Sequence, residues 1–182
     1  MHATNVRIVE LGAGDVLGRR RELAPLWPEA SRDRIDDILP RHAAREGFRF
    51  LGAFDDDALV GFVYGYNGAT GQWWHDRVAN ALGKAGTARW LPPGHFEFTE
   101  LHVDPTRRRE GIGGALHDAI FELVDAPTAV LSTQTDNEPA IALYEGRGWQ
   151  VIVPYLDFGS GRPFLIMGRE LSPEHAAHVR AR

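Results

Sequence analysis

The stretch RRREGIGGAL, residues 107–116, decides the interpretation of the whole sequence. Residues 95–103 before it alternate aromatic or branched residues with polar ones, which predicts a strand, and the residues after it predict an amphipathic helix. Gly111, Gly113 and Gly114 therefore lie where a strand turns into a helix. The first turn of a helix has unpaired N–H groups at the positive end of its dipole, and glycine lets an oxygen-rich ligand approach them. The stretch predicts a site for phosphate or pyrophosphate.

Two other phosphate loops compete with this interpretation. The dinucleotide fingerprint G-x-G-x-x-G requires Gly or Ala where this sequence has Leu116, although Asp136 lies about where the ribose-binding acid would fall. The Walker pattern is excluded because no Gly-Lys-Ser/Thr follows the glycines. A nucleotide-binding protein or oxidoreductase therefore stays open as an alternative function.

Composition limits the class of protein. A length of 182 residues favours one domain, and a formal net charge of -5 argues against a nucleic-acid partner. The absence of cysteine excludes disulfides, thiolate zinc sites and a cysteine nucleophile, and we expect no metal. No stretch resembles a signal peptide or is long enough to span a bilayer, so we expect a cytoplasmic protein without a membrane partner, as a monomer or homodimer.

The rest of the chain predicts a mixed α/β sheet, mostly antiparallel, with flanking helices and a β-α-β core in a single domain, 1–182. The expected strands are 6–11, 48–54, 59–66, 95–103, 128–133 and a last pair around the turn at 157–162. Ser31 is a plausible cap for a helix that Pro40 should kink or divide and that Gly47 closes. Residues 67–94 form a glycine- and tryptophan-rich insertion in which 73–83 predicts a short helix, and the tail 172–182 predicts a loose helix.

Two blocks of the sequence resemble the GNAT superfamily of acyl-CoA-dependent N-acyltransferases. RREGIG resembles the R/Q-x-x-G-x-G/A signature, with Arg108, Gly111 and Gly113 in its positions, and ELHVDP resembles the strand before it. DNEPAIALYEGRGW resembles the block N-x-x-A-x-x-L-Y-x-x-x-G-F/W; the matching residues are Asn137, Ala140, Leu143, Tyr144, Gly148 and Trp149. The resemblance covers residues 95–170 well, and the N-terminal half matches only in element order.

The resemblance implies acetyl-CoA as co-substrate. In this family the loop amides hold the pyrophosphate of coenzyme A, and the pantetheine runs along the preceding strand. By position, the expected cofactor-binding residues are Leu101, His102, Val103, Arg108, Arg109, Gly111, Ile112, Gly113, Gly114, Asn137 and Tyr144. Arg107 has no expected task beyond a contact with a coenzyme A phosphate or water.

Acyl transfer to an amine needs a neutral amine, a polarised carbonyl and a proton for the leaving thiolate. In the family the tyrosine at the place of Tyr144 faces the sulfur, so Tyr144 is the expected general acid, and a neutral phenol with a pKa of about 10 can donate at pH 7. Glu100, and after it Glu97, are the candidate bases; each is equally compatible with a surface acid. Their odd spacing predicts opposite strand faces unless a bulge resets the parity. Because there is no cysteine, direct transfer in a ternary complex is the simpler mechanism.

The acceptor is a small-molecule or peptide amine that the sequence does not identify. Trp73, Trp74, His75 and Trp90 either line its pocket or pack the insertion onto the sheet. A non-catalytic acyl-CoA sensor on the same fold is the main alternative to an N-acetyltransferase.

Overall fold

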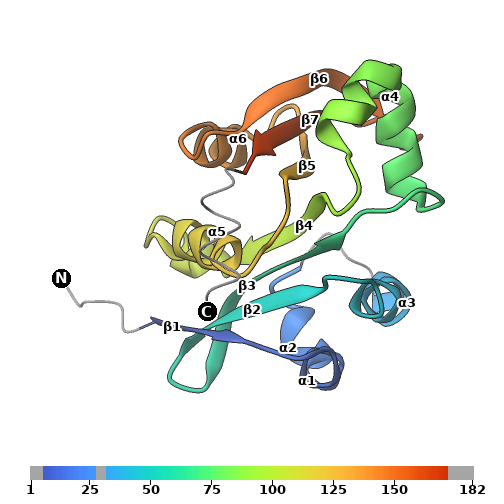
Figure 1. Ribbon diagram of the computed structural model, residues 1–182. Helices are drawn as coiled ribbons and strands as arrows, with labels where there is room; N and C mark the ends of the chain where they lie inside the picture. The colour runs from blue at the N-terminus through green and yellow to red at the C-terminus, as the bar shows by residue number, and fades with distance from the viewer. Residues whose placement is uncertain (1–5, 28–31, 172–182) are drawn as a thin grey trace. The chain divides into compact units, whose positions relative to one another are not determined.

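The computed structural model describes residues 6–27 and 32–171 (Figure 1). Its strands form one sheet with the order β1-β2-β3-β4-β5-β7-β6. The chain divides into two compact units, unit 1 (Met1–Tyr66 and Thr99–Val124) and unit 2 (Asn67–Phe98 and Asp125–Arg182). The predicted cap Ser31 and the predicted tail helix lie outside the described residues.

The strands lie close to the predicted ranges. They are β1 (Val6–Glu10), β2 (Arg49–Asp55), β3 (Ala58–Asn67), β4 (Phe96–Val103), β5 (Thr128–Gln134), β6 (Gln150–Asp157) and β7 (Pro163–Glu170). The pairs β1–β2, β2–β3, β5–β7 and β6–β7 are antiparallel, whereas β4 and β5 pair in parallel at Phe96 and Glu97. The predicted mixed, mostly antiparallel sheet with a β4-α5-β5 crossover is confirmed.

The helices differ from the prediction in two places. They are α1 (Ala13–Gly18), α2 (Arg20–Leu23), α3 (Arg32–Ala43), α4 (Trp73–Trp90), the 3-10 turn η1 (Pro105–Arg107), α5 (Ile112–Phe121) and α6 (Glu138–Glu145). The sequence predicts that Pro40 kinks or divides this helix; α3 is not divided there, and the Pro40 carbonyl accepts from the Ala44 amide at 3.2 Å. Within α4, Gly83 (φ 67°) ends the predicted segment, but a second helical segment continues to Trp90. No helix in the described ranges is long and apolar enough to cross a membrane.

Unit 1 is organised around the antiparallel strands β1, β2 and β3. Helices α1, α2 and α3 cover one face of these strands, with α5 on the other (Figure 1). The core between these three helices and the strands consists of aromatic and aliphatic side chains: Val16, Leu23, Leu26, Trp27, Ile35, Leu39, Phe50, Phe62, Tyr64 and Tyr66. On the second face Gly61 lies so close to Ile112 and Leu116 that an added Cβ would be 3.4 and 3.3 Å from their side chains. This packing holds α5, and with it the loop at its start, against the strands.

Unit 2 packs α4 onto β5, β6 and β7. The shared core comprises Val78, Trp90, Leu91, Val130 and Ile166. Trp90 lies flat enough on β7 that an added Cβ at Gly168 would meet its ring at 2.6 Å, and the Thr128 hydroxyl donates to its carbonyl at 2.9 Å. The second segment of α4 is therefore stabilised by packing on the sheet, which explains its length.

Candidate functional site

The glycine loop has the conformation of an anion-binding helix start. Gly111 is the N-cap of α5 in the left-handed region (φ 83°), and it makes no side-chain cap hydrogen bond. Arg109 also has a positive φ, 67°, which is uncommon for a residue with a side chain. Residues 108–111 are exposed. The first-turn amides of α5 thus lie at an exposed loop with no side-chain cap, as a phosphate ligand requires.

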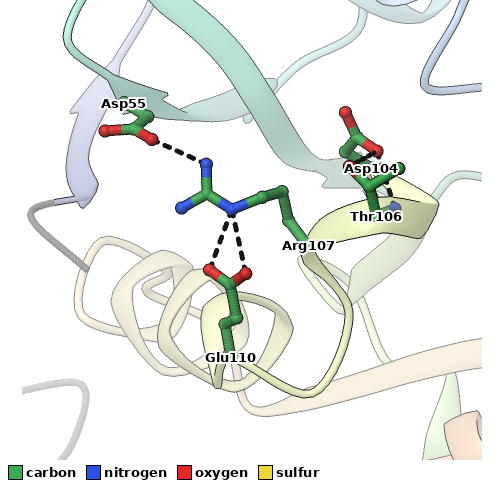
Figure 2. Close-up of polar contacts among 5 residues, drawn as sticks. All are labelled: Asp55, Asp104, Thr106, Arg107 and Glu110. Carbon is green, nitrogen blue, oxygen red and sulfur yellow. Dashed lines mark hydrogen bonds and ion pairs between the residues drawn. The ribbon is translucent and has the colours of Figure 1, made fainter. Parts of the chain in front are cut away.

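Arg107 fixes the loop from one side. Its Nη1 donates to Asp55 Oδ2 at 2.7 Å, and its Nε donates to the two carboxylate oxygens of Glu110 at 2.9 and 3.0 Å. Figure 2 shows the guanidinium reaching between the end of β2 and the residue before Gly111. The hydrogen bonds to Asp55 and then to Glu110 raise the pKa of Arg107 above its ordinary value. A planar guanidinium suits this double contact, which one ammonium group cannot reproduce.

Asp104 fixes the other end of the same loop. Its Oδ1 accepts from the Thr106 hydroxyl at 2.7 Å and from the Thr106 amide at 2.8 Å, which caps η1 (Figure 2). The hydroxyl bond and then the amide bond lower the pKa of Asp104. Its own amide donates to the Val60 carbonyl of β3 at 2.9 Å. The path from β4 to α5 is therefore hydrogen-bonded before the glycines begin.

Glu100 and His102 lie two residues apart on β4 and contact each other. His102 Nε2 is 2.8 Å from Glu100 Oε2, and both side chains are about one-fifth exposed, 19% and 22%. The His102 ring packs against Trp27 and Phe62, with centroids 5.7 and 5.3 Å away. A carboxylate that is orientated by a histidine and still reached by solvent can accept a proton.

Glu97 has a different environment from Glu100. Its side chain is 3% exposed, and its Oε1 lies 3.8 Å from His75 Nδ1 and 3.6 Å from His95 Nε2. Burial lowers the pKa of His75, the neighbouring His95 lowers it further, and Glu97 and Asp76 act in the opposite direction.

Tyr144 lies in an aromatic cluster of unit 2. Its ring meets Phe98 edge-on at 5.9 Å and Trp149 at 5.9 Å, and the residue is 8% exposed. Asn137 begins the same helix, and its Oδ1 accepts from the Ala140 amide at 3.4 Å as the N-cap. The predicted catalytic task of Tyr144 and the predicted place of Asn137 beside the cofactor stay predictions.

The tryptophans of residues 67–94 mainly pack α4 onto the strands of unit 2. Trp74 Nε1 donates to Ser132 Oγ at 3.1 Å, and Trp90 is 4% exposed on β7. Trp73 is different, because it is 57% exposed, with Phe158 at 5.5 Å and the Arg77 guanidinium over its ring at 5.2 Å. Of the three, Trp73 is the one left accessible to an acceptor.

The predicted cofactor contacts belong to both units. Unit 1 contains Leu101, His102 and Val103 on half-buried β4, and it contains the loop 108–114. Unit 2 contains Asn137 and Tyr144. Within unit 1 the strand leads through η1 directly into the loop, as the sequence predicts.

Sequence reasoning missed several residues of these sites. The tasks of Arg107, Asp104 and Thr106 in the loop, and the position of His95 beside Glu97, were not predicted. The spacing His95-x-Glu97 is a usable signal, since residues two apart along an extended chain share a face. The contact of Arg107 with Asp55 has no local signal, because the two residues are 52 positions apart.

Comparisons with known proteins agree with this geometry. A family model described as "Acetyltransferase (GNAT) family" matches residues 18–149. A GCN5-like protein acetyltransferase of Mycobacterium tuberculosis (strain ATCC 25618 / H37Rv) is 37% identical to this chain over 121 residues. The matched stretch covers 62% of this chain and 59% of the relative. The chain thus spans less than two thirds of that relative's length.

Solved structures share the fold at low sequence identity. An aminoglycoside 6'-acetyltransferase type Ii is 20% identical, with a TM-score of 0.65 over 92% of this chain and 98% of the other. The PaiA N-acetyltransferase of Thermoplasma acidophilum in complex with coenzyme A is 16% identical, with a TM-score of 0.55 over 92% and 99%. At these identities the likeness shows the fold.

Proposed function

The chain belongs to the GNAT acetyltransferase family, and from this premise we propose that it transfers an acetyl group from acetyl-CoA to a primary amine by direct attack in a ternary complex. The observation that carries the proposal is the start of α5, where the glycine N-cap leaves the first-turn amides to an anion. The bound coenzyme A of the Thermoplasma acidophilum structure supports the same ligand for this fold.

The cofactor is assigned to the loop and to β4. We assign the pyrophosphate to the amides of Arg109, Gly111, Ile112, Gly113 and Gly114. The main chain of Leu101, His102 and Val103 is assigned to the pantetheine. The hydrogen bonds of Arg107 with Asp55 and of Asp104 with Thr106 support this assignment, because they hold the loop in place before a ligand arrives.

Glu100 and Tyr144 have separate tasks in the proposed chemical step. Glu100 takes a proton from the acceptor ammonium, the amine nitrogen attacks the thioester carbonyl carbon, and the carbon–sulfur bond breaks. Tyr144 gives its phenolic proton to the departing thiolate, and the proton that the attacking nitrogen loses as the amide forms returns to Tyr144. Glu100 is preferred over Glu97 because its carboxylate is orientated by His102 and is reached by solvent, whereas Glu97 is buried beside two histidines.

The acceptor is proposed to be a protein or peptide amine rather than a small molecule. The relative at 37% identity is a GCN5-like protein acetyltransferase, which supports a protein or peptide acceptor. The net charge of -5 favours a cationic acceptor through electrostatic steering.

Thiol release from acetyl-CoA in the presence of an amine panel tests the function. The panel contains lysine peptides, peptides with free N-termini and an aminoglycoside. Amine-dependent thiol release and an acetylated product of the matching mass are expected. Binding of coenzyme A without release by any amine would identify a sensor, and stabilisation by NAD or ATP in place of acetyl-CoA would identify a nucleotide-binding protein.

Gly111→Ala should weaken acetyl-CoA binding about 5- to 30-fold, because a left-handed conformation costs an L-residue about 1–2 kcal/mol. An added Cβ at Gly111 meets nothing within 4 Å, so the backbone is the cause and not a clash. The matched control is Gly14→Ala in α1, where the space is equally open and φ is ordinary. Calorimetric titration with acetyl-CoA compares the two variants, and equal affinities would contradict the loop assignment.

Arg107→Lys should raise the KM for acetyl-CoA by about two- to fivefold and leave the KM for the amine unchanged. A lysine cannot contact Asp55 and Glu110 together as the guanidinium does, so the loop populates its binding conformation less. Arg49→Lys, which alters the exposed pair with Glu10 at 2.9 Å, is the control. Steady-state kinetics with each substrate varied measures both KM values. Identical values for the two variants would show that the contacts of Arg107 with Asp55 and Glu110 have no role in acetyl-CoA binding.

A further inference from the structure

Three potential metal ligands from different segments of unit 2 converge in its interior. His75 comes from the first turn of α4, His95 from the residue before β4, and Glu97 from β4 itself. They are 5%, 1% and 3% exposed. One ligand atom from each lies within 4.8 Å of the other two.

The tautomer of His95 suits a ligand. Its Nδ1 lies 2.9 Å from the carbonyl oxygen of Pro92. A carbonyl only accepts, so Nδ1 carries the hydrogen, and in the neutral ring Nε2 carries the lone pair. That Nε2 faces His75 Nδ1 at 3.4 Å and Glu97 Oε1 at 3.6 Å. A histidine that donates its other N–H to a carbonyl is the usual arrangement at a metal site.

The separations match the size of a metal ion. The three atoms form a triangle with sides of 3.4, 3.6 and 3.8 Å. The circle through three such points has a radius of about 2.1 Å, which is the bond length from zinc to imidazole nitrogen or carboxylate oxygen. As hydrogen bonds the same separations are long. The triangle is therefore about the right size for three ligands of one zinc ion, which in a tetrahedral site lies slightly off the plane of those ligands.

We propose that His75 Nδ1, His95 Nε2 and Glu97 Oε1 bind a divalent first-row transition-metal ion, best matched by zinc. Two imidazoles and a carboxylate suit zinc and do not suit magnesium, which prefers oxygen ligands. A buried carboxylate is costly unless it is neutralised, and the cation supplies the charge. Water would take the fourth position of a tetrahedral ion.

The site has a structural task at the base of the insertion. The Gly68 amide donates to the His95 carbonyl at 3.0 Å, which closes the segment between them. The Gly68 backbone lies so close to His95 Nε2 and Glu97 Oε1 that an added Cβ would overlap both atoms, so only glycine fits at this position. A metal ion would tie α4 to the same point, and closing a long segment in this way stabilises the folded state. His75 also lines an open hollow of about 630 Å³ together with Thr70 and Trp73.

Metal titration of the tag-free protein tests the proposal directly. The protein is dialysed against a chelator and then titrated with Zn²⁺ by calorimetry. One equivalent should bind, and the Tm should rise by about 5–10 °C when free Zn²⁺ is 100 times Kd. Mg²⁺ should give neither effect. Co²⁺ in place of Zn²⁺ should give the visible absorption of a four-coordinate nitrogen and oxygen site.

Substitutions assign the binding to the three residues. Glu97→Gln and His95→Ala should each weaken Zn²⁺ binding at least 10- to 100-fold. His117→Gln, which alters a buried histidine of unit 1 paired with Asp118, should bind one Zn²⁺ as the unchanged protein does. No saturable binding in the unchanged protein, or unchanged affinity in Glu97→Gln and His95→Ala, would overturn the proposal. Because the readouts are binding and Tm, the result does not depend on acetyltransferase activity.

Discussion

Tyr144→Phe is expected to lower the kcat of acetyl transfer by about 10²–10⁴-fold, the usual contribution of a general acid. The phenol is proposed to protonate the thiolate of coenzyme A, and phenylalanine has no proton to give. Because the ring remains, its packing against Phe98 and Trp149 is kept, and the KM for acetyl-CoA should change little. Steady-state kinetics of thiol release at saturating amine measures the effect.

Tyr155→Phe is the matched control for this change. Tyr155 lies on β6 and is 64% exposed, so the same loss of a hydroxyl should leave kcat unchanged. A Tyr144→Phe variant with the kcat of the control would show that Tyr144 is only a packing residue. An equal loss in kcat and in acetyl-CoA affinity would show that it binds the cofactor and does not protonate the thiolate.

Glu100→Gln is expected to lower kcat at pH 7 by about 10²-fold, at the lower end of the range for a general base. Glutamine keeps the shape and a hydrogen-bonding oxygen for His102 but cannot accept the proton of the ammonium. The deficit should shrink as the pH approaches the pKa of the acceptor amine, about 10.4 for an alkylamine, since the free amine is then already present. A pH–rate profile of both enzymes shows this convergence.

Glu97→Gln distinguishes the two carboxylates. If Glu97 is a metal ligand, the Glu97→Gln variant binds Zn²⁺ more weakly and has a lower Tm. Its pH–rate profile at moderate temperature keeps the shape of the profile of the unchanged enzyme. If the Glu97 variant shows the pH-dependent deficit and the Glu100 variant does not, the base is Glu97 and the assignment to Glu100 is wrong. Glu145→Gln, on the exposed surface of α6, is the control for the substitution itself.

The fold was predictable wherever the sequence pattern is local. The alternation in β4 and the glycines before α5 each depend on neighbours within a few residues, and each is confirmed as an element of the structure. The length of α4 was not predictable in this way. Gly83 ends the local helical pattern, and the segment beyond it is held by the packing of Trp90 on β7.

The candidate site shows the same difference between local features, which were predictable, and long-range contacts, which were not. The glycine loop was predictable because a positive φ at Gly111 and an uncapped helix start are properties of that short stretch. The brace of Arg107 was not, because its partner Asp55 ends a strand far earlier in the chain. The spacing of Glu97 and Glu100 predicted different faces, but nothing in it indicated which one would be buried beside histidines.

By itself, then, the sequence determined the order of the elements, the glycine-capped start of α5 and the family to which the chain belongs, since these depend on short-range backbone preferences and on matched motifs. Only the tertiary structure decided that Glu100 meets His102, that Arg107 braces the loop, and that His75 and His95 surround Glu97. The physical reason is that a side chain's partners and its burial are set by which distant segments pack together, and these two properties decide whether a carboxylate serves as a base, a brace or a metal ligand.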